Sequence, residues 1–201
     1  DELRIGFAAA GTRYVYDGDG SNDKGVANAV EGTLYGAWVG KPVELLIGAR
    51  YGHSWMETKR ILRFDDLVNR VEGEFEGNEV GVYGELARAF GSPQRAELTP
   101  FASVAYSWLD FEDFDEVGRS TLRMQVDGTD VDSAATSIGL RLAAERKMDD
   151  DLLIRPRLRA AWGHEWADVV REVNGEFVAG GGSLDLEGAE MPRDRAELSV
   201  G

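Results

Sequence analysis

The sequence predicts an all-β fold, an antiparallel up-and-down transmembrane β-barrel with about eight strands in this chain. Apolar and polar side chains alternate at period two over the stretches predicted as strands, which is the spacing of side chains along a β-strand. Opposite the aliphatic residues stand mostly glycine, alanine and serine with isolated arginines and glutamates, whereas a sheet surface in water would favour longer polar side chains. Short turns alternate with long loops, which is the asymmetry of outer-membrane barrels.

The first half of the chain contains four predicted strands, at residues 3–16, 29–40, 43–62 and 77–90. In the first of them, Leu3, Ile5 and Phe7 share one face. Arg4 and Gly6 lie on the opposite face. The third and fourth strands repeat this division between an aliphatic face and a small or polar face.

The second half contains four more predicted strands, at residues 97–111, 133–146, 153–166 and 193–201. The third of these reads LIRPRLRAAWGHEW and places Arg155, Arg157 and Arg159 at alternate positions. If lipid surrounds this strand, its apolar face meets the lipid and the three arginines face a polar lumen. We therefore expect the arginines to pair with inward carboxylates from other strands, with Glu85 as the first choice for Arg157.

The predicted connections fall into two classes. The long loops are 17–28, 56–76, 111–132 and 167–194, and the short turns lie near Pro42, Pro93 and Asp150. In a meander each connection reverses the chain direction, so alternate connections lie at opposite ends of the sheet. We therefore expect all the long loops on one rim of the barrel and all the short turns on the other.

Composition narrows the functional classes. A chain of 201 residues suits one barrel domain, residues 1–201. The net charge of −15 argues against nucleic acid as a partner, and the sequence has no run of 18 apolar residues that would form a transmembrane helix. The absence of an initiator methionine and of a signal sequence indicates a mature region or an excised piece. With no cysteine and only two histidines, we expect no metal, no cofactor and no catalytic group.

The candidate functional surface is a lumen lined with charged side chains on the small, polar face. Its members are Arg4, Glu44, Arg50, Glu79, Glu85, Arg141, Arg155, Arg157, Arg159 and Glu197. Either these charges bind a polypeptide segment or pass ions, or they pair with one another because an unpaired buried charge is costly. A second set of aromatic residues near strand ends is expected at the membrane interfaces: Trp38, Tyr51, Trp55, Tyr106, Trp108, Trp162 and Trp166.

Six short motifs, in order along nearly the whole chain, carry a resemblance to a known family. They are GTLYGAW, ARYGHSWMETKR, VYGELARAF, LTPFASVAYSWLDFEDFDE, AAWGHEWAD and EMPRDRAELSVG. Each resembles a segment of the translocator β-domain of autotransporters, the type V secretion proteins of Gram-negative bacteria. The six motifs in the family's order make the resemblance more specific than any one of them alone.

The resemblance implies an outer-membrane barrel that anchors or exports a passenger. It implies lipid around the barrel, a passenger segment in the lumen and the outer-membrane assembly machinery as a partner. The family's barrel resembles a twelve-stranded structure with a helix through its lumen, so about eight strands here imply a fragment or a truncated barrel, with about two strands missing at each end. The alternative is a soluble β-barrel or sandwich whose aliphatic face turns inward around a small apolar ligand.

Overall fold

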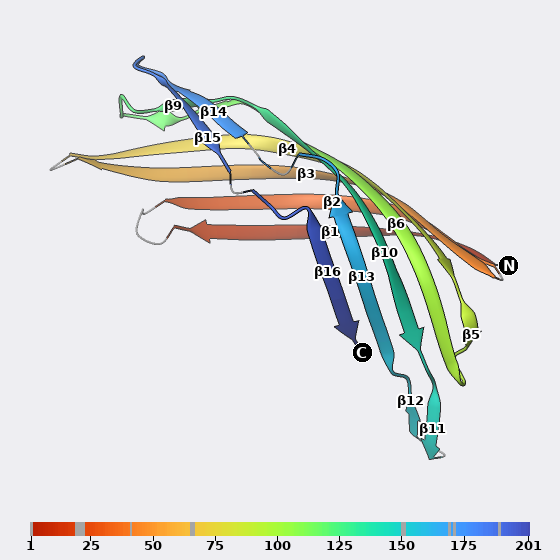
Figure 1. Ribbon diagram of the computed structural model, residues 1–201. Helices are drawn as coiled ribbons and strands as arrows, with labels where there is room; N and C mark the ends of the chain where they lie inside the picture. The colour runs from red at the N-terminus through yellow and green to blue at the C-terminus, as the bar shows by residue number, and fades with distance from the viewer. Residues whose placement is uncertain are drawn as a thin grey trace.

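The computed structural model describes residues 2–18, 23–40, 42–64, 67–149, 152–168, 170, 172–188 and 190–201. Its main element is a sheet with eight long strands (Figure 1), namely β1 (Glu2–Asp17), β2 (Lys24–Val39), β3 (Val43–Phe64), β4 (Leu67–Arg88), β6 (Ala96–Phe111), β10 (Thr129–Ala143), β13 (Arg157–Glu165) and β16 (Asp194–Val200). Among the described residues, no helix is both long and apolar enough to cross a membrane.

The long strands form an antiparallel meander in which each strand pairs with the next long strand along the chain. The predicted all-β, up-and-down architecture is therefore confirmed. The sheet curves strongly, and within the described part of the chain β1 and β16 form its two edges (Figure 1). The connections at Pro42 and Pro93 and the β10–β13 connection lie at one end, here called the short-turn end, and the others lie at the long-loop end. Asp150 itself lies outside the described residues.

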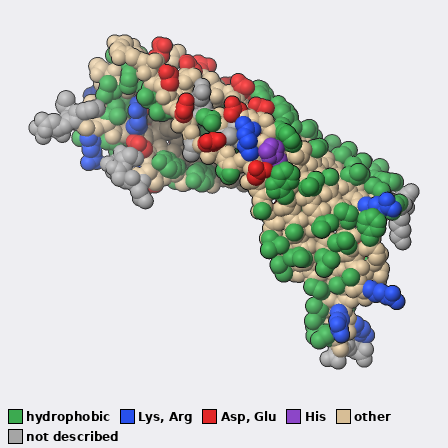
Figure 2. Space-filling model, in the orientation of Figure 1, with side chains coloured by type: hydrophobic (Ala, Val, Ile, Leu, Met, Phe, Trp, Pro, Cys, Tyr) green, Lys and Arg blue, Asp and Glu red, His purple; other side chains and the backbone are tan. Residues whose placement is uncertain are grey.

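The two faces of the main sheet, here called the wall, differ as the alternation predicts. On the outer face, Leu34 lies opposite both Phe7 and Ala49, and the aliphatic row continues through the later strands. Its side chains are open to the surroundings: Phe7 is 82% exposed and Val104 is 60% exposed. On the inner face lie the buried side chains of Glu85, Thr99 and Phe101. Hydrophobic side chains accordingly cover one part of the surface in Figure 2, and acidic side chains gather on another part.

One of the predicted long loops is largely strand, and another is strand in part. β3 and β4 have 22 residues each and pair continuously from Val43↔Arg88 to Phe64↔Leu67, so that residues 56–64 and 67–76 continue the ladder. β2 likewise begins at Lys24, inside the predicted loop 17–28. A membrane crossing needs about 9–11 strand residues. β3 and β4 are each about twice that long, and their further halves carry the charged side chains that made the segment resemble a loop.

The predicted strand at 153–166 is interrupted, which corrects the expectation for Arg155. β12 (Leu152–Ile154) forms a separate hairpin with β11 (Arg146–Asp149), and β13 begins only at Arg157. Pro156 explains the break, because proline has no N–H to donate to a ladder. Its carbonyl oxygen still accepts a hydrogen bond of 3.1 Å from the backbone N–H of Ala144.

A second sheet, here called the rim sheet, extends the wall at the long-loop end. It has the strand order β15 (Ser183–Glu187), β14 (Glu172–Phe177), β9 (Met124–Val126) and β7 (Phe114–Asp115). Each strand of the rim sheet is next in the chain to one long strand of the wall: β7 to β6, β9 to β10, β14 to β13 and β15 to β16. The rim sheet therefore repeats the order of these wall strands. Two short strands complete the wall: β8 (Val117–Gly118) pairs with β4, and β5 (Phe90–Ser92) pairs with β6. The predicted loops 111–132 and 167–194 therefore contain strands of their own.

Candidate functional site

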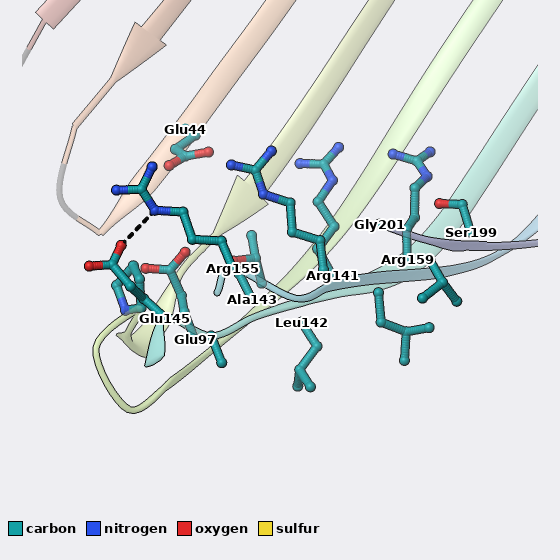
Figure 3. A pocket seen from close by; sticks show the side chains of 16 residues that line it. Glu44, Glu97, Arg141, Leu142, Ala143, Glu145, Arg155, Arg159, Ser199 and Gly201 are labelled. Carbon is teal, nitrogen blue, oxygen red and sulfur yellow. Dashed lines mark hydrogen bonds and ion pairs between the residues drawn. The ribbon is translucent and has the colours of Figure 1, made fainter. Parts of the chain in front are cut away.

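The strand register places most of the predicted lumen charges on the inner face. Directly opposed residues of neighbouring strands lie on the same face of the sheet, and this relation leads from buried Phe101 to nine of the predicted charges. They are Arg4, Glu44, Arg50, Glu79, Glu85, Arg141, Arg157, Arg159 and Glu197. Arg155 precedes β13, but its guanidinium group points to the same side as those of Arg141 and Arg159 (Figure 3). One face of the wall thus gathers charges from strands that are far apart in the sequence.

Among the described residues, the most deeply buried charge is the carboxylate of Glu85 on β4, which is 6% exposed. It contacts the guanidinium group of Arg141 on β10 and accepts a hydrogen bond of 2.7 Å from the hydroxyl of Tyr83. The expected pairing of Glu85 with Arg157 is therefore wrong. The register explains the difference, because β6 alone separates β4 from β10, whereas β13 lies one strand further away.

Two arginines share the ring of Phe101. Arg141 and Arg159 lie directly opposite each other across the β10–β13 ladder, an arrangement that is destabilising for like charges unless something offsets it. The guanidinium carbons lie 4.5 Å and 4.3 Å from the centroid of the Phe101 ring, within the range of cation–π attraction. Arg159 Nε also lies 3.1 Å from a carboxylate oxygen of Glu197, at ion-pair distance but without hydrogen-bond geometry.

The remaining predicted charges lie in shallower surroundings. Arg50 pairs with Glu79 in the middle of the wall, and Arg4 pairs with its neighbour Glu2 at the exposed edge strand, at 2.8 Å. Arg155 Nε donates a hydrogen bond of 2.9 Å to Glu145. A cavity of about 670 Å³ at the short-turn end is lined by both signs of charge, among them Glu44, Glu97, Arg141, Glu145, Arg155, Arg157 and Arg159 (Figure 3). Because side chains of both signs line it, the cavity favours a zwitterionic or polar occupant over a simple ion.

The Phe101 ring fits because residue 139 has no side chain. We expect Gly139→Ala to destabilise the domain by about 1–2 kcal/mol through overpacking. The added Cβ would lie 2.5 Å from the carbonyl oxygen of Ala160 and 2.6 Å from the ring of Phe101. Gly32→Ala is the matched control, since a Cβ there meets nothing within 4 Å. Urea unfolding in lipid–detergent micelles measures both variants, and equal losses would contradict the close packing at Gly139.

Further toward the long-loop end, the inner face forms a trough of about 610 Å³. Gly48, Gly81 and Ala105 lie along it, and Tyr35 and Tyr83 stand beside them. Gly48, Gly81 and Ala105 carry little or no side chain, so the wall leaves an open space beside the two tyrosines. Arg50, which lies over Gly81, supplies a positive charge there.

The register places Trp38, Tyr51, Trp55, Tyr106, Trp108 and Trp162 on the outer face, and Trp166 follows the end of β13. Trp38 lies near the short-turn end. Beyond Trp55 and Trp108, in the long-loop direction, the outer face continues with Glu57 and Asp110. The indole N–H of Trp166 donates a hydrogen bond of 2.9 Å to Thr136 Oγ1. Large aromatic side chains thus stand where the aliphatic surface gives way to a charged one.

Sequence reasoning missed Tyr83, Phe101 and Glu145 as members of the charged network. Tyr83 and Phe101 are aromatic residues with the parity of the polar face, and that mismatch was the available signal. Glu145 lies outside the long strands, so strand alternation could not identify it.

The comparison with protein-family models agrees with this architecture. A model of the autotransporter β-domain family matches residues 1–201. Among solved structures, the chain is similar to the translocator domain of the autotransporter NalP from Neisseria meningitidis, with 14% sequence identity and a TM-score of 0.32, over 98% of this chain and 85% of that chain. A comparison with curated proteins finds no match.

Proposed function

This chain belongs to the autotransporter β-domain family, and from that premise we propose that residues 1–201 act as one unit whose inner face holds a passenger segment during export. The family places the domain in the outer membrane of Gram-negative bacteria, as a β-barrel of the type V secretion system. Its members transport and anchor other polypeptides. Our proposal concerns the part that this chain's own residues take in that process.

The observation that carries the proposal is the opposite character of the two faces of the wall. The outer face exposes aliphatic side chains such as Val104 and Leu198, which are 60% and 73% exposed, and lipid is the solvent that would cover them. The inner face combines the trough at Gly48 and Gly81 with paired charges. Small residues leave space for a polypeptide backbone, and paired charges satisfy its polar groups without a strong preference for one sequence.

The soluble alternative is not favoured. It requires the aliphatic face to turn inward around an apolar ligand, but the side chains buried by the curvature belong to the other face, for example Glu85 and Thr99. The assembly machinery of the outer membrane belongs to our proposal as well. During insertion, strands that are not yet paired leave backbone groups unsatisfied in lipid, and an assembly partner would shield them.

Filling the trough tests the proposal. We expect Ser107→Trp to reduce surface display of an epitope-tagged passenger fused upstream of the domain, because the indole would occupy the space beside Gly81. Tyr106→Trp is the matched control, because the neighbouring side chain points to the outer face. Display is measured by antibody labelling of intact cells, normalised to the amount of domain in the outer membrane. Equal display by the two variants would refute transport along the inner face.

A further inference from the structure

The polarity of the wall inverts beyond the membrane. In the rim sheet, directly opposed residues in the ladders share a face. One face carries Asp115, Gln125, Asn174, Glu176, Asp185 and Glu187. The other face carries the apolar side chains of Phe114, Met124, Val126, Val173, Phe177, Leu184 and Leu186. These seven residues together with Phe75 of β4 are here called the inner collar. The spanning wall is apolar outside and polar inside, and the rim is the reverse.

Ring stacking shows that the inner collar continues the inner face of the barrel. Phe114 of the rim sheet stacks on Phe75 of β4, with ring centroids 4.7 Å apart and an angle of 11° between the planes. Phe75 points to the inner face, as Glu85 on the same strand does. Phe114 also covers Gly73, the next inner position on β4. The apolar side of the rim sheet therefore faces the mouth of the lumen.

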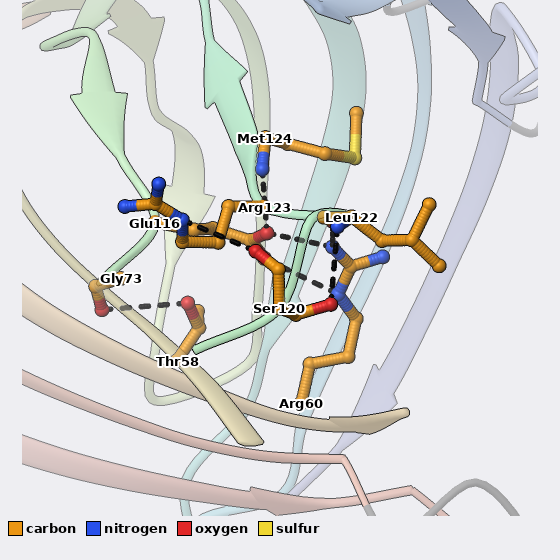
Figure 4. A network of polar contacts seen from close by, with 8 residues as sticks. All are labelled: Thr58, Arg60, Gly73, Glu116, Ser120, Leu122, Arg123 and Met124. Atoms are coloured by element: carbon orange, nitrogen blue, oxygen red, sulfur yellow. Dashed lines mark hydrogen bonds and ion pairs between the residues drawn. The ribbon is translucent and has the colours of Figure 1, made fainter. Parts of the chain in front are cut away.

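A polar contact fastens the rim to the wall on the same side (Figure 4). The guanidinium group of Arg60 on β3 donates to both carboxylate oxygens of Glu116, at 3.2 and 2.6 Å. Glu116 is 8% exposed and also accepts a hydrogen bond of 2.9 Å from the backbone N–H of Met124. These bonds hold β9 close to the wall, so the inner collar has a defined position at the mouth.

Much of the inner collar remains uncovered. Val173 is 42% exposed, Leu184 is 37% exposed and Leu186 is 53% exposed. Lipid cannot cover them, because the outer face at this level carries charges such as Glu72 and Glu74 and the collar is on the other side of the wall. Under the proposed function, a polypeptide that leaves the lumen passes the collar.

We infer that the inner collar is a docking surface for apolar side chains of the unfolded passenger as it emerges from the barrel. This inference rests on the proposed function and adds the class of side chain that is recognised and the place of recognition. A chain in an extended conformation exposes its apolar side chains to water on leaving the lumen. Contact with Leu184 and Leu186 removes part of that surface from water, which favours forward movement out of the trough.

Site-specific crosslinking to a stalled passenger tests the inference. The probe is an unstructured Gly/Ser-rich segment with regularly spaced phenylalanines and an epitope tag, fused upstream of the domain and stalled by a disulfide-bonded module at its far end. Benzoylphenylalanine replaces Leu186 in one variant and its neighbour Asp185 in the other, which point to opposite faces of the same strand. A third variant carries the photoreactive residue at Ser137, on the inner face of the spanning wall.

We expect crosslinks to the probe from position 186 and from position 137, and background from position 185. Leu184→Ser should lower the yield from a photoreactive residue at Val173 by about tenfold, as should replacement of the probe's phenylalanines by serine. Crosslinks from position 137 without crosslinks from position 186, or equal yields from positions 185 and 186, would refute docking at the inner collar and leave the proposed function standing. Stalled probe that crosslinks at none of the inner positions would overturn both.

Discussion

Val104→Arg should abolish most insertion of this domain into lipid bilayers, with a loss of about 2–4 kcal/mol in the free energy of folding. Val104 lies in the middle of the apolar stretch of β6 and is 60% exposed on the outer face. A guanidinium group at that depth lies in hydrocarbon, where it meets no water and no carboxylate. The measurement is refolding from urea into phosphatidylcholine vesicles, followed by tryptophan fluorescence and by the shift in electrophoretic mobility of the folded barrel.

Ala105→Arg is the control for this experiment. The two residues are adjacent on β6, and Ala105 points to the inner face, opposite Tyr83 on β4. An arginine there enters a polar lumen that already holds Arg50, Glu79 and Glu85. We expect a loss below about 1 kcal/mol. If Ala105→Arg disrupts insertion as much as Val104→Arg does, lipid does not surround the outer face.

Along the long strands, the alternation of side chains predicts which face of the sheet a residue occupies. Along β6, alternation predicts one face for Ala102, Val104 and Tyr106, and the ladders with β4 and β10 place them there. This succeeds because a period of two is a local property of an extended backbone, so neither the turns nor the partner strands need to be known. The family follows from motifs spread over the same strands, and the family model over residues 1–201 confirms it.

Partners across strands were much harder to predict. Glu85 was assigned to Arg157 because both are central in their strands, whereas its contact is with Arg141. Choosing between these arginines requires the number of strands between them and the stagger of each ladder, neither of which alternation supplies. Pro156 was a missed local signal, because a residue without an N–H inside an apparent strand predicts the interruption that separates Arg155 from β13.

The rim sheet shows a different reason for failure. Residues 111–132 and 167–194 are rich in charge and glycine, a composition that is typical of loops. Above the membrane, however, polar residues belong on the outside, so the apolar alternation that marks a strand is carried by the inner face. In β15, Leu184 and Leu186 alternate with Asp185, and the same period of two is present at reversed polarity. A search for alternation without an assumed outside would have found it.

The contact between Glu85 and Arg141 is the second place where one substitution should have a large effect. We expect Glu85→Ala to destabilise the domain by about 3 kcal/mol, because it leaves the Arg141 guanidinium without its carboxylate in a partly desolvated lumen. Tyr83 also loses the acceptor of its hydroxyl. Urea unfolding in micelles measures the loss. Glu79→Ala is the matched control, since the Arg50–Glu79 pair is 46% and 31% exposed and should contribute about 1 kcal/mol or less.

A double-mutant cycle separates the worth of the pair from the cost of breaking it. Glu85→Leu combined with Arg141→Leu should be milder than Glu85→Leu alone, since two apolar side chains leave no charge unpaired beside Phe101. Arg159 then keeps both the Phe101 ring and Glu197, 3.1 Å away, and needs no new partner. Strictly additive losses in the double variant would show that Glu85 and Arg141 act independently, and that the charges of the inner face are solvated by water instead of by one another.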